Sequence, residues 1–199
     1  MLITTVVVLV CLWVRNHYRE TKEKISKIDE VFAMAQYGSA HSPPELLPEG
    51  NTAVFIVGNS RGGGLHALLW VQRMFPNHFQ NFVFMNARTV DSKAYGGREA
   101  LEAMRVDASV SLNYFVNFCR SHGLRAKSYL SFGTDAVEEL TNLAKVVAEN
   151  HPNAIFFTSK LVFENENILT RLLHNQAALE LQRRLHSAGQ QMVILPMRL

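Results

Sequence analysis

The sequence predicts an α/β fold, namely a Rossmann-like five-stranded parallel sheet with helices on both faces. Two observations predict it. From residue 52 onward, short hydrophobic runs alternate with amphipathic helical patterns, and those runs are almost continuously apolar, as strands buried on both faces are. A third observation concerns residues 1–14, which are all apolar or Thr and are followed by a basic stretch. We therefore expect the end of a membrane helix and a stalk before the α/β domain.

The elements are expected in the order that a parallel sheet requires. Strands are predicted at residues 53–57, 82–90, 126–132, 154–159 and 192–196, and helices at 65–74, 98–122, from Asp135 through Val147, and 166–187. Asp135 is a suitable N-cap with Glu138 three residues on, and Gly123 and Gly189 are suitable helix stops. Core stripes at three- and four-residue spacing support the helices, including Cys119 in the second and Ala177 in the last.

Composition excludes several classes of protein. The 199 residues suit one domain with a small appendage, and 48% hydrophobic residues are too many for a disordered chain. A net charge of +3, without basic clusters interleaved with aromatics, argues against a nucleic-acid partner. The two cysteines form no disulfide framework, and the eight histidines form no metal-ligand cluster with them. No metal is expected.

The first 51 residues divide into three parts. Residues 1–14 are expected to be the end of a transmembrane helix, since a complete crossing needs about 20 residues. A marginal anchor and a buried N-terminal helix remain alternatives. Residues 15–35 are expected to form an amphipathic juxtamembrane stalk, because the apolar residues Ile25, Ile28, Val31 and Phe32 recur at helical spacing. The cations of this stretch predict that the domain lies on the cytoplasmic side of the membrane. Residues 36–51 have the composition of a linker, and 52–199 form the cytosolic α/β domain.

The candidate ligand site is the glycine-rich turn after the first strand. It comprises Gly58, Asn59, Ser60, Arg61, Gly62, Gly63 and Gly64. Three interpretations remain open. Gly58 to Gly62 fits the G-x-S-x-G of a nucleophile elbow, which makes Ser60 the nucleophile of a membrane-anchored serine hydrolase with His151 as its loop-like partner. The turn also suits an anion or nucleotide at a helix N-terminus, although G-x-G-x-x-G is absent. A structural role for the glycines is the third interpretation.

Other candidates follow later strands of the same sheet. Thr134 follows the third strand and Ser159 ends the fourth, so both are expected at the rim where parallel strands end. Asp91 follows the second strand, where a Rossmann site holds a ribose-binding acid, and His66 lies beside the glycine-rich turn. Cap, loop and helix-turn roles are the alternatives for all four residues.

Strings across nearly the whole chain carry a resemblance to a known family. They are RNHYRE, SKIDEVF, TAVFIVGNSRGGGLHALL, FPNHFQNFVFMNARTVDS, SFGTDAVEEL, AIFFTSKLVF and LLHNQAALELQRRLHSAGQQMVILPMRL. The sequence resembles the C-terminal cytosolic domain of bacterial amino acid permeases of the amino acid–polyamine–organocation superfamily. That domain is similar in architecture to universal stress proteins.

The resemblance implies a regulatory or assembly domain that is not an enzyme, located at the cell inner membrane on the cytoplasmic side. Its partners are the membrane and a transporter core upstream in the same polypeptide, with a homodimer left open. The segment before the last strand lacks the glycine spacing of ATP-binding universal stress proteins. No cofactor is therefore expected, while nucleotide binding stays an alternative, as does a free-standing stress-type nucleotide binder.

Overall fold

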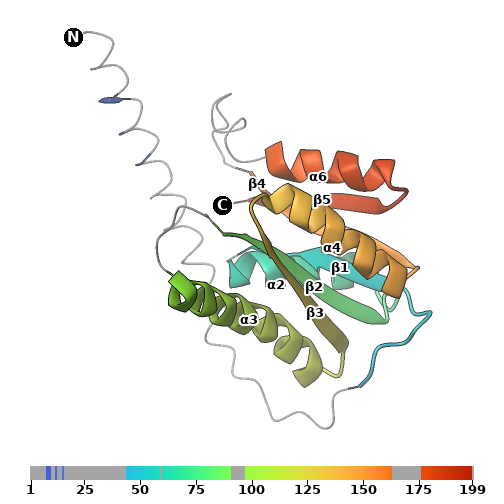
Figure 1. Cartoon of the computed structure of the whole chain (residues 1–199). Helices are drawn as coiled ribbons and strands as arrows, with labels where there is room; N and C mark the ends of the chain where they lie inside the picture. Colours follow the sequence, from blue (N-terminus) through green and yellow to red (C-terminus); the bar gives the residue numbers. More distant parts are fainter. Residues whose placement is uncertain are drawn as a thin grey trace.

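The computed structural model describes residues 8, 9, 12, 15, 44–58, 60–90, 97–162 and 176–198. It shows an α/β sandwich in which a central sheet separates two layers of helices (Figure 1). The elements are β1 (Thr52–Ile56), α2 (Arg61–Met74), β2 (Asn81–Thr89), α3 (Gly97–Ser121), β3 (Arg125–Gly133), α4 (Ala136–Asn150), β4 (Ala154–Val162), α6 (Gln176–Ser187) and β5 (Gln191–Arg198).

The five strands pair in the order β3-β2-β1-β4-β5, and every pairing is parallel. β1 is the central strand, and four of its five residues are buried because helices cover both of its faces. The prediction of a five-stranded parallel α/β sheet is therefore confirmed. Strand order reverses between β1 and β4, since the chain first builds outward through β2 and β3 and then returns to the other side of β1.

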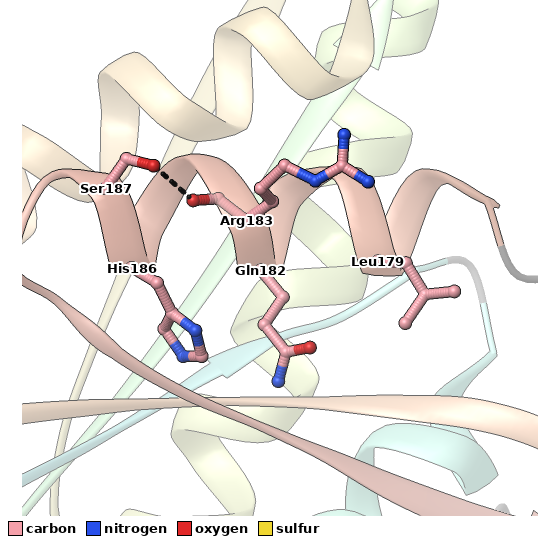
Figure 2. Close-up of a pocket in the computed structure, with 5 residues that line it drawn as sticks. All are labelled: Leu179, Gln182, Arg183, His186 and Ser187. Atoms are coloured by element: carbon pink, nitrogen blue, oxygen red, sulfur yellow. Dashed lines mark hydrogen bonds between the residues drawn. The ribbon is translucent and has the colours of Figure 1, made fainter.

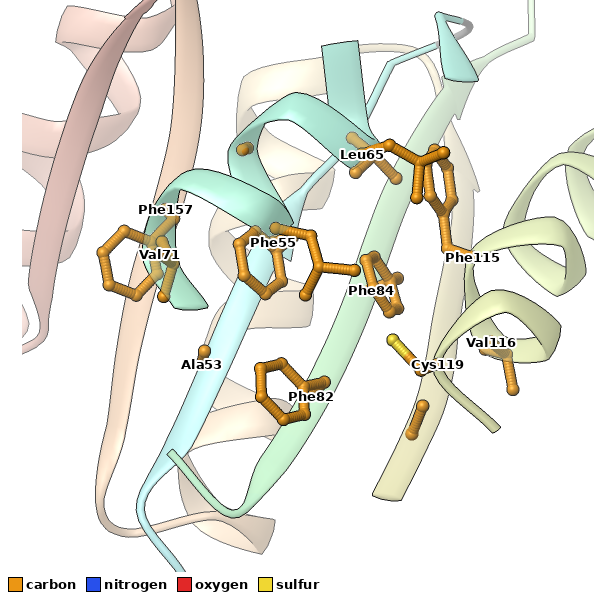
Figure 3. Close-up of a cluster of buried hydrophobic side chains, with 14 of the residues drawn as sticks. Ala53, Phe55, Leu65, Val71, Phe82, Phe84, Phe115, Val116, Cys119 and Phe157 are labelled. Carbon is orange, nitrogen blue, oxygen red and sulfur yellow. The ribbon is translucent and has the colours of Figure 1, made fainter. Parts of the chain in front are cut away.

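The helices α2 and α3 cover one face of the sheet through an aromatic core (Figure 3). Phe55 of β1, Phe84 of β2 and Phe157 of β4 point toward this face, where Phe55 stacks against both other rings at centroid distances of 5.4 and 5.7 Å. Phe115 of α3 stacks on Phe84 at 5.1 Å, and Cys119 is fully buried one helical turn further along. The predicted core stripe of this helix is thus confirmed in its second half.

The helices α4 and α6 cover the opposite face over a smaller core with fewer aromatic rings. Its members alternate with those of the aromatic core along each strand, as the two-residue period of a strand requires. Leu181 and Leu185 of α6 are buried there, as predicted, whereas Ala177 is exposed near the first turn of α6. The inward position predicted for Ala177 is wrong, because the packed stripe of the described helix begins one turn later.

The helix ends match the local signals in the sequence. The Asp135 carboxylate caps α4 by accepting hydrogen bonds from the backbone N–H groups of Val137 and Glu138 at 2.8 and 3.0 Å. These two bonds lower the pKa of the Asp135 carboxyl because they stabilise its charged form. Gly123 and Gly189 follow α3 and α6 with φ of 73° and 77°, the left-handed conformation that stops a helix.

Residues 44–51, predicted as the end of a linker, are bound to the sheet. The backbone of Leu47 exchanges two hydrogen bonds with the Asn81 side chain, at 2.9 and 2.7 Å. The predicted membrane-helix end, the stalk and residues 36–43 lie almost wholly outside the described residues, as do Asn59, Asp91 and residues 166–175 of the last predicted helix. Among the residues that the structure describes, no helix has the length and apolar character needed to cross a bilayer.

Candidate functional site

The carboxyl ends of β1 and β4 lie side by side at the centre of the sheet. Ile56 is in register with Thr158, so the turn after β1 begins beside Ser159. From β1 the chain continues into α2 on one face, whereas the next described helix after β4, α6, covers the other face. This is the topological switch point, where open α/β sheets bind their ligands. We use the name switch point for the ends of β1 and β4 with Gly58, Ser60 and Ser159.

The connection from β1 to α2 is shorter than predicted. Ser60 is the N-cap of α2, and its hydroxyl oxygen accepts a hydrogen bond from the backbone N–H of Gly63 at 3.0 Å. Gly62, Gly63 and Gly64 therefore belong to the first helical turn, where all three are buried. The predicted helix start at residue 65 is wrong by one turn, because a serine cap compensates for the poor helix propensity of glycine.

The glycines of this turn have different roles. A Cβ added to Gly64 would lie 2.4 and 2.5 Å from two ring carbons of Phe115, so Gly64 allows α2 to pack closely on α3. Gly58 is exposed, and a Cβ there would meet no atom within 4 Å. The structural interpretation of the glycine-rich turn thus fits Gly64. Gly58 instead leaves backbone open at the switch point, which a ligand needs for close approach.

Asn86 holds this turn from the neighbouring strand. It is 4% exposed, and its side-chain amide donates to the carbonyl oxygens of Val57 and Gly58 at 2.6 and 3.4 Å. The two bonds fix the end of β1 in the plane of the sheet. Asn86 was not among the site residues predicted from the sequence. An asparagine within an apolar strand run is a recognisable signal, because strands are depleted in this residue.

Two arginines lie on the α2–α3 side of the same edge. The Arg61 guanidinium lies over the ring of Tyr114 at 5.1 Å from its centroid. Arg88, near the end of β2, pairs through Nη2 with Asp107 of α3 at 3.1 Å. The Arg88 Nε is buried and has no hydrogen-bond partner among the described residues. Asp107 compensates the charge of Arg88, so Arg61 is the cation that adds to the N-terminus of α2, which itself favours anions.

The other predicted site residues lie in different places in the structure. Ser159 lies at the switch point, because β4 pairs directly with β1. Thr134 is exposed at the end of β3, the outermost strand, with β2 between it and β1. Two strand spacings amount to about 10 Å, so a single phosphate group does not contact both Thr134 and Gly58. His66 is exposed on α2.

The Ser60 geometry differs from that of a nucleophile elbow. Its backbone is extended, with φ of −80° and ψ of 115°, whereas an elbow holds its nucleophile in a strained conformation. His151, the suggested partner, follows α4 at the amino edge of the sheet, and its Nε2 lies 3.2 Å from the hydroxyl of Tyr129. Ser60 and His151 thus lie at opposite edges, and the described geometry gives the hydrolase interpretation no support.

An open groove of about 590 Å³ lies elsewhere, along α6 (Figure 2). It is lined by Leu179, Gln182, Arg183, His186 and Ser187. Figure 2 shows Gln182 and His186 extending from the same side of α6. Gln182 donates to the carbonyl oxygen of Met192 at 2.9 Å, and His186 Nε2 accepts from its N–H at 3.4 Å. These side chains satisfy the free backbone of the edge strand β5, so we assign them a protective role.

The described residues contain no group of three or more His, Cys, Asp and Glu side chains able to hold a metal ion. Burial raises the pKa of the Cys119 thiol to about 12, so this thiol is protonated near neutral pH and is a poor nucleophile. No protein-family model matches the chain, and neither does any curated protein sequence.

Proposed function

We propose that this chain carries a non-catalytic ligand-sensing domain of an amino acid transporter, and that the domain takes a small anionic ligand at the switch point. The observation that carries the proposal is the open backbone at Gly58, directly before the Ser60-capped N-terminus of α2. A helix N-terminus presents N–H donors and a positive dipole to an anion. The Arg61 side chain, in the first turn of α2, adds charge of the same sign.

A phosphate-bearing metabolite such as a nucleotide is the ligand class that fits these features. A phosphate binds well to the backbone N–H donors of a helix N-terminus and to guanidinium groups. The ends of β1 and β4 are the position at which nucleotides bind in sheets of this topology. A free-standing nucleotide-binding protein is the alternative that the sequence leaves open, and it would use the same surface. Experiment separates this alternative from the transporter proposal.

The transporter part of the proposal rests on the sequence. The chain resembles permease C-terminal domains over nearly its full length, and an apolar run with a basic flank precedes the domain. We infer a cytoplasmic domain at the inner membrane, attached to a transport core in the same polypeptide. A ligand that binds one docked state of the domain better than another would shift the transporter between the two states.

Ligand binding is tested by thermal unfolding of the full chain in detergent, with AMP, ATP or inorganic phosphate added. A ligand at about 100 times its Kd stabilises by about 2.7 kcal/mol, which corresponds to a Tm increase of about 5–10 °C for a chain of this size. Gly58→Val should abolish the increase, because its side chain fills the open space at the switch point. Thr134→Val, on the same edge but two strands away, should leave the increase with inorganic phosphate intact. An unchanged increase in Gly58→Val would reject the site.

The link to transport is tested separately. An antibody against the domain should detect a membrane-bound native polypeptide much larger than 22.5 kDa. Removal of residues 45–199 from that polypeptide should change uptake or its response to metabolites. A soluble native band near 22.5 kDa would reject the transporter assignment, while leaving the ligand site open as a free-standing binder.

A further inference from the structure

The outward side of α2 carries large apolar side chains among cations. Residues at positions i, i+3, i+4, i+7 and i+8 share one face of a helix, and on α2 this series is His66, Leu69, Trp70, Arg73 and Met74. Leu69 and Met74 are 42% and 55% exposed, and Trp70 is half-buried. His66 and Arg73 are exposed as well. We call these five residues the α2 outer face.

The apolar character of this face is not required by the fold. The opposite side of α2 packs in the aromatic core, where Leu68 and Val71 are fully buried. A surface helix ordinarily places polar side chains on its outward side, and exposed apolar side chains that gather on one face mark an interaction surface. Trp70 is also held in place, since the ring of Phe75 packs edge-on against it at a centroid distance of 6.3 Å.

The surroundings of the α2 outer face lack carboxylates. No Asp or Glu occurs from residue 50 to residue 90, the stretch that contains β1, α2 and β2. The neighbouring helix α3 has its carboxylates in its first half and none from residue 108 to residue 121. Arg73 forms no ion pair with another residue that the structure describes. The face therefore suits a partner that is anionic at its surface and apolar beneath.

An anionic lipid bilayer has both properties. Its headgroups attract arginine side chains, and the boundary between headgroups and acyl chains receives Trp, Leu and Met. A second copy of the chain fits less well. A two-fold contact through the α2 outer face would bring the cations of both copies into one interface, with no carboxylate from residues 50–90 to compensate them.

The polypeptide that precedes β1 passes the end of α2 that carries Arg73 and Met74. The Asn51 side chain donates to the carbonyl oxygen of His78 at 3.3 Å, and the His78 N–H donates to the carbonyl oxygen of Phe75, the residue after α2, at 3.3 Å. A weak contact is sufficient for a domain that is already attached to the bilayer, because two weak anchors together give stable membrane binding.

We propose that the α2 outer face rests on an anionic membrane surface. Leu69, Trp70 and Met74 enter the boundary below the headgroups, and Arg73 binds lipid phosphate groups. The layer formed by α4 and α6 then faces away from the membrane. This inference rests on the membrane attachment in the proposed function and does not depend on a ligand at the switch point.

The test uses Trp70 as a reporter of lipid contact. The chain contains two tryptophans, so Trp13→Phe leaves Trp70 as the single one. The full chain with this change is reconstituted in nanodiscs whose lipids carry bromine on their acyl chains, because bromine quenches tryptophan fluorescence on contact. We expect Trp70 to be quenched in discs that contain phosphatidylglycerol, and to lose most of this quenching in discs of phosphatidylcholine alone.

The charge contribution is tested by Arg73→Glu in the same background. This variant changes two charges at the lipid surface, so it should weaken docking about tenfold or more and remove most of the quenching. Lys145→Glu is the matched control, because it makes the same charge change at an exposed position of α4 in the opposite layer. It should leave the quenching intact.

The apolar contribution is tested by Leu69→Ser/Met74→Ser, which should also remove most of the quenching. Its matched control is Val106→Ser/Val110→Ser on α3, where the two valines are 61% and 51% exposed. This control removes as many exposed apolar side chains outside the α2 outer face, so the quenching should persist. Each variant is compared in brominated and unbrominated discs, which separates lipid contact from a change in Trp70 itself.

The remaining outcomes overturn the proposal in different ways. Equal quenching with the two lipids, or full quenching in Arg73→Glu, would show that the cations have no role. Shielding of Trp70 from aqueous iodide without quenching by bromine would show that protein covers the face. Discs that hold the chain without quenching Trp70 would reject docking alone. A chain that the discs do not retain would reject the membrane attachment together with docking.

Discussion

At the amino edge of the sheet, the fully buried Asn81 makes four hydrogen bonds, which join Leu47, Gly50 and Thr52 to the start of β2. At the carboxyl edge, Asn86 makes two, to the carbonyl oxygens of Val57 and Gly58. An asparagine side chain thus joins three segments of backbone at the amino edge, whereas the asparagine at the carboxyl edge holds a single turn. The difference indicates where stability and function are located, because a ligand needs backbone that the protein leaves accessible.

The largest expected effect is that of Asn81→Ala. It removes all four hydrogen bonds, leaving the Leu47 N–H without its partner and the buried Thr52 hydroxyl without its donor, at a cost of about 3 kcal/mol in the free energy of unfolding. Asn86→Ala removes the same atoms at the other edge and should cost about 1–2 kcal/mol. Urea unfolding of both variants measures the difference. Equal costs would show that the two edges are equally dependent on their amides.

Two glycines sharpen the comparison within the carboxyl edge. Gly64→Ala places a Cβ against the Phe115 ring and should destabilise by about 1–3 kcal/mol, since the aromatic core has no space to receive it. Gly58→Ala meets no atom within 4 Å and should stay within about 0.5 kcal/mol of the unmodified chain. Thermal unfolding compares the two. A large loss for Gly58→Ala would mean that the turn is closed in solution.

Substitutions at Ser60 distinguish a capping role of its hydroxyl from a catalytic one. Ser60→Ala should cost about 1 kcal/mol, because the Gly63 N–H loses its acceptor. Ser60→Asp should retain most of the stability, since aspartate is an equally good N-cap. Neither variant has a hydroxyl, so a fluorophosphonate probe provides an independent measurement. Specific labelling of the unmodified chain that both variants abolish would restore the hydrolase interpretation.

The strands could be predicted from the sequence because their signal is local. Continuous apolar runs separated by helical stripes define a parallel sheet, and Asp135, Gly123 and Gly189 act within a few residues of their own position. The start of α2 could not be predicted in this way. Three consecutive glycines have poor helix propensity. The requirement for glycine at residue 64 comes from Phe115 of α3, far along the chain, whose ring would clash with a Cβ there.

The candidate site depended on strand order, which local patterns do not determine. In the sequence, Thr134 and Ser159 are equivalent, since each follows or ends a predicted strand. The sheet places β4 beside β1 and β3 at the outside, so only Ser159 accompanies Gly58. Asn86 is different, because an asparagine within an apolar strand run is a local signal that the sequence itself contains.

The smallest expected effect concerns pH and the amino edge. His151 is 6% exposed, its Nε2 contacts the Tyr129 hydroxyl, and its buried Nδ1 has no hydrogen-bond partner among the described residues. Burial, and then the charge of Lys127, lower the pKa of His151. Below about pH 6.5 the unfolded chain takes up a proton that the folded chain resists, so acidification should reduce the free energy of unfolding.

His151→Gln keeps a hydrogen-bonding group near Tyr129 but does not titrate, so it should lose this part of the pH dependence between pH 7.5 and about 5.5, within the range where an ordinary histidine ionises. His122→Gln, at an exposed histidine, is the matched control and should keep it. Urea unfolding at each pH gives the slopes. If His151→Gln retained the slope of the unmodified chain, the imidazole would be hydrated in solution, and the amino edge would be as open to water as the carboxyl edge.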